Sequence, residues 1–223
     1  MMAATPLKLA ILISGRGSNM EALARACQAG TLAARVAVVI ADREAAAGLA
    51  AARELGLATA TVLPSGGTAG FERALEAEIA RYRAGALALA GFMRVLSQGF
   101  VGRYLGRMFN IHPSLLPKYR GLHTHRRVLE AGDALHGASV HFVTAELDAG
   151  PVVLQSCLEV RAGDTEASRP SERCGVEWLL AHARKQQRRQ RGPTRQASDM
   201  GGEDASFACC QSSHCGFRRA SAT

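Results

Sequence analysis

The sequence has few aromatic residues, no long apolar run and no cysteine pattern typical of a zinc finger or a disulfide scaffold. Only 5% of its 223 residues are aromatic, with a single Trp. No stretch approaches the ~18 uninterrupted apolar residues that a transmembrane helix needs, and the N-terminal residues lack the small-residue cleavage site of a signal peptide. These absences argue against a membrane protein and favour a cytoplasmic one.

Cysteine is scarce before residue 169, where only Cys27 and Cys157 occur. Isolated thiols of this kind are typical of a reduced intracellular protein. Positive charge is also concentrated late in the chain, because residues 169–223 hold 10 Lys and Arg against 5 Asp and Glu, out of a total formal charge of +8. The basic run at 184–191 has no interleaved aromatic residues, so we expect no nucleic-acid partner.

Apolar residues make up 48% of the chain, and they alternate between strand-like runs and helical spacing. Buried strands that alternate with helices predict an open, mostly parallel, Rossmann-like α/β sheet with helices on both faces. After Gly137 the apolar spacing changes to partial two-residue alternation, which predicts an antiparallel edge. The predicted strands are 7–14, 35–41, 58–63, 86–91 and 107–112, and the predicted helical stretches start near residues 20, 43 and 71.

The first strand ends in a Gly-rich turn, SGRGSN, which presents backbone N–H groups at the start of a helix. Such a turn can bind a phosphate, because converging N–H groups and the helix dipole attract an anion. Gly-rich turns also occur for steric reasons alone, so both interpretations stay open. Met20 stands where a dinucleotide fingerprint would have its third glycine, which argues against a hydride-transferring enzyme.

A second motif, FNIHPSLLPKYRG, places Asn110 and His112 two residues apart at the end of a buried strand. Their side chains therefore point to the same side of the sheet. An amide beside an imidazole suits acyl transfer to an amine, because the amide can stabilise an oxyanion while the imidazole moves protons. A histidine with a purely structural role is the alternative. Asp148, in a Gly-flanked loop, could turn its carboxylate toward His112 and orient the ring.

Several stretches together resemble one family. They are LISGRGSNMEA, AGFMRVLS, NIHPSLLPKYRGLHTHRRVLEAGDALHGASVHFVTAELDAGPVVLQ and AGDTEAS. Over residues 8–168 the chain is similar to the folate-dependent formyltransferases of the phosphoribosylglycinamide type. The resemblance implies formyl transfer from 10-formyltetrahydrofolate to the amine of glycinamide ribonucleotide in purine biosynthesis, by a monomer or homodimer, with no metal, nucleic acid or membrane partner. The related formyltetrahydrofolate deformylases share the ELDxGP loop and remain an alternative.

The resemblance also implies roles for individual residues. Asn110, His112 and Asp148 would be the catalytic set, supported by Ser139 and His141. The phosphate of glycinamide ribonucleotide would bind at Gly17, Ser18, Asn19 and Met20. The folate pocket would be lined by Met93, Arg94, Val95, Leu96, Thr144, Ala145, Glu146 and Leu147. Some members hold the folate with an arginine near the position of Thr68, so we expect a different contact there.

Two other groups of polar residues could have suggested metal binding. His123 and His125 have no further ligands at zinc-like spacing, so we expect them at a helix start. In the tail, Cys209, Cys210 and Cys215 lack a partner pair at finger spacing.

The resemblance ends at Ser168. We therefore expect a catalytic domain at 1–168 and an atypical C-terminal tail at 169–223, disordered from about residue 184 or translated in a shifted reading frame. Glu177 falls near the family's substrate-contacting glutamate, but the sequence around it differs. Two hypotheses follow: a working formyltransferase with an unusual tail, or an inactive or unstable product that at most binds its ligands.

Overall fold

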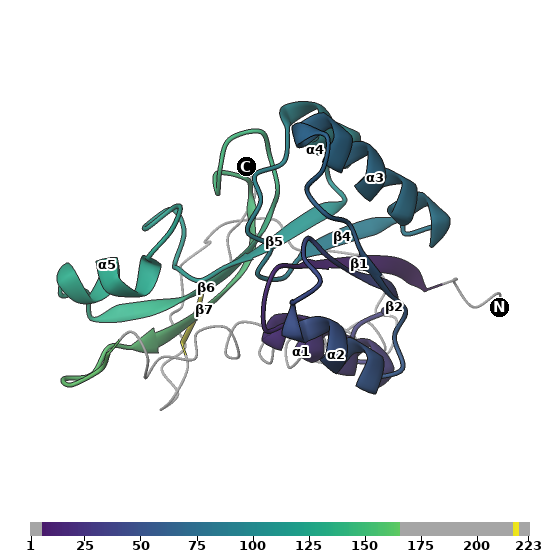
Figure 1. The fold of residues 1–223 in the computed structure, drawn as a ribbon. Helices are drawn as coiled ribbons and strands as arrows, with labels where there is room; N and C mark the ends of the chain where they lie inside the picture. Colours follow the sequence, from purple (N-terminus) through teal and green to yellow (C-terminus); the bar gives the residue numbers. More distant parts are fainter. Residues whose placement is uncertain (1–5, 166–215, 219–223) are drawn as a thin grey trace, which may run out of the picture.

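The computed structural model describes residues 6–165 and 216–218. Within these residues the chain forms one eight-stranded sheet in the order β3-β2-β1-β4-β5-β6-β7-β8 (Figure 1). Strands β1 to β5 pair in parallel, and β6, β7 and β8 add an antiparallel edge. The predicted sheet is therefore confirmed. The strands are β1 (Leu7–Ile13), β2 (Ala34–Ala41), β3 (Thr59–Thr61), β4 (Ala86–Leu89), β5 (Met108–His112), β6 (Leu135–Phe142), β7 (Val152–Glu159) and β8 (Gly216–Arg218).

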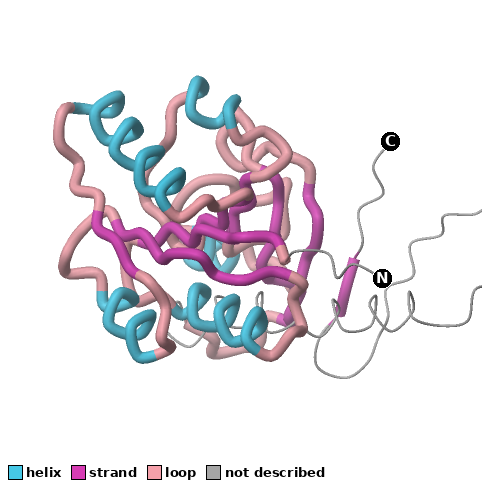
Figure 2. Tube along the Cα trace, turned by 90° about the vertical axis from the view of Figure 1, so that its right-hand side faces the viewer, coloured by secondary structure: helices cyan, strands magenta, loops and turns pink. Residues whose placement is uncertain are grey.

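Helices cover both faces of the parallel part of the sheet (Figure 2). Helices α1 (Ser18–Gln28) and α2 (Ala47–Glu54) lie on one face, and α3 (Gly67–Arg81) and α4 (Gln98–Arg103) lie on the other. Helix α5 (Thr124–Glu130) lies beside β6 at the far end of the sheet. None of the helices in the described ranges is long and apolar enough to cross a membrane.

The residues of β1 alternate between two cores. Leu9, Ile11 and Ile13 pack with α1 and α2, whereas Ala10 and Leu12 pack with α3 and α4. A central strand that is buried on both faces needs apolar residues at every position, which explains its uninterrupted apolar run. Each fully buried Leu or Ile side chain contributes about 1.5–3 kcal/mol of hydrophobic stabilisation.

The strand order reverses at the carboxyl ends of β1 and β4. The chain leaves β1 toward β2 on one side, and β4 lies on the other side of β1. The loops that follow these two strands therefore diverge, and open α/β sheets bind ligands at such a point. Ser14 joins the two loops: its backbone N–H donates to Gly91 O at 3.1 Å, and its Oγ accepts from the N–H of Met93 at 2.9 Å.

Candidate active site

The pairing of β5 with β6 brings Asn110, His112 and His141 together. In this antiparallel pair Asn110 lies opposite His141, and His112 lies opposite Ser139. Directly opposed residues of an antiparallel pair place their side chains on the same face of the sheet, close enough to interact. Asn110 Nδ2 is 3.2 Å from His141 Nε2. The strand register thus builds one side of the site.

Asp148 reaches this group from the loop between β6 and β7. Its Oδ2 is 3.3 Å from His112 Nδ1, and its Oδ1 is 3.3 Å from Asn110 Nδ2 and 3.5 Å from His141 Nε2. The loop returns very close to β6, because a Cβ at Gly150 would lie 1.8 Å from the carbonyl oxygen of Phe142. Only a glycine allows this approach. The structure therefore brings together the three residues of the predicted catalytic set.

Both ring nitrogens of His112 face oxygen acceptors. Nδ1 faces the Asp148 carboxylate, and Nε2 lies 2.9 Å from the backbone carbonyl oxygen of Tyr119. A doubly protonated ring can donate to both oxygens, whereas a neutral ring can donate to only one. His112 is only 5% exposed, so these contacts are shielded from water. The two oxygen acceptors therefore fix the orientation of the ring.

The charge of Asp148 is stabilised by its neighbours. Burial opposes ionisation, but the contact with His141, the N–H of Gly121 donating at 2.9 Å and the two nearby imidazoles together hold the pKa of this carboxyl below its usual range. Asp148 is therefore charged at neutral pH, and it can orient both histidine rings.

The two predicted supporting residues occupy different places. His141 contacts Asn110 and Asp148 directly, and its Nδ1 lies 2.9 Å from Phe142 O. Ser139 is fully buried away from this group, and its Oγ donates to Ser114 O at 2.6 Å. The same Oγ accepts from the N–H of Leu116 and from Gln155 Nε2. Ser139 thus fixes the loop after β5 to β6 and β7.

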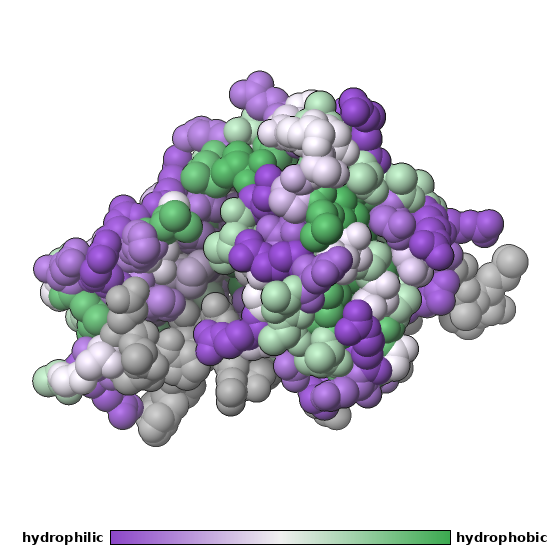
Figure 3. Space-filling view, viewed as in Figure 1, coloured by the Kyte–Doolittle hydropathy of each residue, from purple (hydrophilic) through white to green (hydrophobic). Residues whose placement is uncertain are grey.

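A cavity of about 530 Å³ opens beside the four residues. All eight residues predicted to hold the folate line it, as do Asn110, His112, His141 and Asp148. Met93 and Val95, which line the cavity, are 64% and 77% exposed. Figure 3 shows patches of hydrophobic surface among the hydrophilic surface on this face of the molecule. The cavity therefore combines an apolar rim with a polar group at one wall, as binding sites for organic ligands commonly do.

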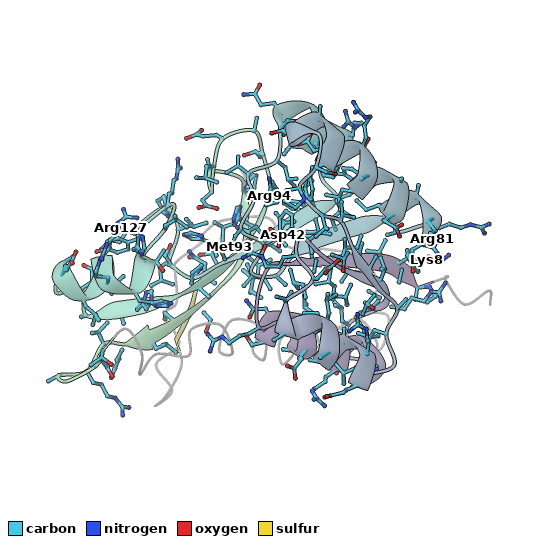
Figure 4. The ribbon with its side chains drawn as sticks, viewed as in Figure 1. Lys8, Asp42, Arg81, Met93, Arg94 and Arg127 are labelled. Carbon is cyan, nitrogen blue, oxygen red and sulfur yellow. The ribbon has the colours of Figure 1, made fainter. Side chains whose placement is uncertain are left out.

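The loop after β4 is fixed by α3. Glu72 accepts two hydrogen bonds from Ser97, from its N–H and from its Oγ, both at 2.6 Å. The Arg94 guanidinium lies over the Phe71 ring, 4.8 Å from its centroid. In Figure 4 Met93 and Arg94 lie between the α3–α4 side and the β6–β7 side of the molecule. Thr68, at the position where we expected an arginine to be missing, is exposed in the first turn of α3.

The predicted phosphate turn lies at the start of α1 and is not part of the cavity wall. Gly17 has a φ of +83° and a Cβ there would lie 2.7 Å from Gly48 Cα, so this position requires glycine. Asn19 and Met20 are buried, and Met20 packs in the core with α1 and α2. Met20 can therefore offer a ligand only its backbone N–H.

Two backbone groups of the site, the carbonyl of Tyr119 and the N–H of Gly121, were not predicted from the sequence. No side-chain pattern identifies a backbone group, and the glycine at position 121 was the only available sign. His123 immediately precedes α5, and His125 lies in its first turn, 2.6 Å from His136 (Nδ1 to Nε2). Within the described residues, no group of three or more His, Cys, Asp or Glu could hold a metal.

Comparison with known proteins identifies the family. Residues 7–173 match the formyl transferase family. The chain belongs to this family. The predicted family and fold are confirmed. The tail predictions concern residues 169–223. Within this range the structure describes only β8 (Gly216–Arg218), which pairs with β7, and the other residues, Glu177 included, lie outside the described residues.

Relatives with known names align with about the same part of this chain, roughly 160 residues. The phosphoribosylglycinamide formyltransferase of Escherichia coli is 50% identical over 162 residues, which cover 72% of this chain and 76% of that protein. The bovine trifunctional purine biosynthetic protein adenosine-3 is 39% identical over 160 residues, 71% of this chain but only 16% of that protein. The crystal structure of glycinamide ribonucleotide transformylase 1 from Symbiobacterium toebii superposes with a TM-score of 0.73 at 36% identity, covering 82% of this chain and 84% of that one.

Proposed function

We propose that this chain transfers a formyl group from 10-formyltetrahydrofolate to the amine of glycinamide ribonucleotide, a step of purine biosynthesis. The observation that carries the proposal is the contact of Asn110, His112 and Asp148 at the wall of a cavity large enough for an organic ligand. The names of the relatives support the choice of substrates. We assign the catalytic domain to residues 1–168, acting in the cytoplasm as a monomer or homodimer, without a metal, nucleic-acid or membrane partner.

The proposed chemistry needs an oxyanion donor and a proton carrier. The substrate amine attacks the formyl carbon, a C–N bond forms and the formyl oxygen becomes negatively charged. The amide N–H of Asn110 would donate to this oxygen, and the positive charge of protonated His112 would stabilise it electrostatically. The C–N10 bond then breaks, N10 takes one proton, and the new amide nitrogen loses one. His112, held by Asp148, would carry this proton.

The proposed phosphate site lies on the loop after β1, and the proposed folate site lies on the loop after β4 and on the loop between β6 and β7. Ser14 joins the first two of these loops. The phosphate would bind at the start of α1, where the helix dipole favours an anion. The folate would occupy the cavity. The residues proposed for the phosphate are Gly17, Ser18, Asn19 and Met20, and those for the folate are Met93, Arg94, Val95, Leu96, Thr144, Ala145, Glu146 and Leu147.

A product assay tests this proposal against its alternatives. The purified chain is incubated with 10-formyltetrahydrofolate, with and without glycinamide ribonucleotide, and both formylated product and free formate are measured. We expect formylated glycinamide ribonucleotide, and its loss in His112→Ala. Formate release that does not depend on the amine would identify a deformylase instead. A folded chain that binds folate but forms neither product would support the inactive alternative.

A further inference from the structure

The backbone of residues 119–121 contacts both members of the His112–Asp148 pair. We name this segment the 119–121 clamp. The carbonyl oxygen of Tyr119 lies 2.9 Å from His112 Nε2, and the N–H of Gly121 donates to Asp148 Oδ2 at 2.9 Å. With the 3.3 Å contact between His112 Nδ1 and Asp148 Oδ2, these interactions close a ring. The orientation of the imidazole therefore depends on where the clamp lies.

The backbone of the clamp adopts a conformation that it would not keep on its own. Tyr119 has a φ of +57°, in the left-handed region that residues with a Cβ rarely adopt, and Gly121 has a φ of +81°. A non-glycine residue persists in this region only when its surroundings hold it there. The contacts that hold Tyr119 must therefore come from outside the clamp.

Asp133 and Arg127 supply these contacts. Asp133, in the turn between α5 and β6, accepts from the Tyr119 hydroxyl at 2.8 Å and from Lys118 Nζ at 2.9 Å. The Arg127 guanidinium lies over the Tyr119 ring, 5.2 Å from its centroid, and donates to the carbonyl oxygen of Arg120 at 2.6 Å. Hydrogen bonds from Lys118 and Tyr119 lower the pKa of Asp133, so this carboxyl stays charged. Neither Asp133 nor Arg127 lines the cavity.

We propose that Asp133 and Arg127 are positioning residues for formyl transfer, because they hold the 119–121 clamp against His112 and Asp148. The effect on turnover rests on the proposed function. Asp133 acts through the Tyr119 hydroxyl, and Arg127 acts through the Tyr119 ring and the Arg120 carbonyl. Both residues lie outside the substrate cavity and affect the reaction only through the clamp.

The kinetic test uses Asp133→Ala, Tyr119→Phe and the double variant. We expect each to lower kcat on the order of tenfold, since small displacements of a reacting group are costly. The double variant should lose no more than either single one, because both remove the same hydrogen bond. KM for glycinamide ribonucleotide should not change, since the phosphate turn lies at α1. Asp133→Asn should keep most of the activity, because its amide oxygen can still accept from Tyr119.

Matched controls separate the clamp from general effects of charge. Arg127→Ala should lower kcat, whereas Arg126→Ala, on the same helix and paired with Glu130 at 3.6 Å, should not. Lys118→Met removes the other partner of Asp133 and should leave kcat unchanged. If Asp133→Asn is as damaging as Asp133→Ala while Tyr119→Phe is active, the charge of Asp133 matters and the clamp does not, and the proposal is overturned.

A second measurement does not depend on turnover. The hydrogen exchange of the Gly121 amide, followed by NMR, reports its bond to Asp148. We expect this amide to be protected in the wild type and to exchange faster in Asp133→Ala and Arg127→Ala, but not in Arg126→Ala. Unchanged exchange would overturn the proposal. If the wild type transfers no formyl group, the proposed function fails, and this exchange measurement still decides whether Asp133 and Arg127 hold the clamp.

Discussion

Replacing Asp148 by Asn tests the electrostatic centre of the site. The three nearest neighbours of the carboxylate are hydrogen-bond donors: the N–H of Gly121 at 2.9 Å, Asn110 Nδ2 at 3.3 Å and His112 Nδ1 at 3.3 Å, with His141 Nε2 at 3.5 Å. An amide side chain has one oxygen and one NH₂, so in either orientation the NH₂ group faces a donor. The substitution keeps the shape of the side chain, but it removes a charge-assisted hydrogen bond and places the new NH₂ group against at least one other hydrogen-bond donor.

The expected loss can be worked out from these contacts. A hydrogen bond to a charged group contributes about 1.5–3 kcal/mol, and a buried group left unsatisfied costs about 1–3 kcal/mol. A total near 3 kcal/mol, expressed in the transition state, lowers kcat by about 10²-fold. The assay is formyl transfer at saturating concentrations of both substrates. Glu130→Gln, an exposed change on α5, is the matched control, because surface ion pairs contribute about 0–1 kcal/mol.

We also expect the stability difference between the wild type and Asp148→Asn to depend on pH. Because the folded protein holds the pKa of Asp148 below the ordinary value of 3.8, the carboxylate stabilises the fold above that pH and loses this contribution as the pH falls through the lower folded value. The difference in unfolding free energy between wild type and Asp148→Asn should therefore be largest at neutral pH and shrink in acid, as measured by urea unfolding. A kcat within about threefold of wild type, or a stability difference that grows in acid, would refute the role we give Asp148.

Two further substitutions test the scaffold of the site. Gly17→Ala adds a Cβ at a positive φ, 2.7 Å from Gly48 Cα, so we expect the free energy of unfolding in urea to fall by about 1–2 kcal/mol. We also expect a raised KM for glycinamide ribonucleotide, and an unchanged KM would argue against phosphate binding at this turn. Ser139→Ala leaves the N–H of Leu116 without its acceptor and removes the hydrogen bond from Gln155. We therefore expect the free energy of unfolding in urea to fall by about 1–3 kcal/mol, with the KM values of both substrates unchanged. Equal stability would show that the hydroxyl is dispensable.

The sequence predicted the sheet well because its local patterns agree with its tertiary contacts. Strand β1 is apolar at every buried position, and this pattern predicts burial on both faces. Helix α4 was missed, because its six residues include two glycines and are too few to show a helical period. Its start is marked instead by Ser97, whose hydroxyl accepts from the N–H of Phe100. Such a short helix depends on a cap that only the structure reveals.

The site was predictable in part. The two-residue spacing of Asn110 and His112 places them on one face without knowledge of the fold. Asp148 lies 38 residues from Asn110 along the chain, and its approach depends on the return of β6 alongside β5. The contact from Tyr119 uses its backbone carbonyl, which every residue type possesses. The catalytic side chains could therefore be predicted from the sequence, whereas backbone groups that reach the site only through the fold of the chain could not.

The hydroxyl of Ser14 connects the turn proposed to bind the phosphate with a loop proposed to bind the folate. It belongs to the turn after β1 and accepts a hydrogen bond from the loop after β4. A molecule that shifts one loop therefore shifts the other, so occupancy of either region should change affinity in its neighbour. Thermodynamic reciprocity requires the same factor in both directions. Two cosubstrates that meet across Ser14 would therefore bind as coupled partners, through both the backbone N–H and the hydroxyl of this residue.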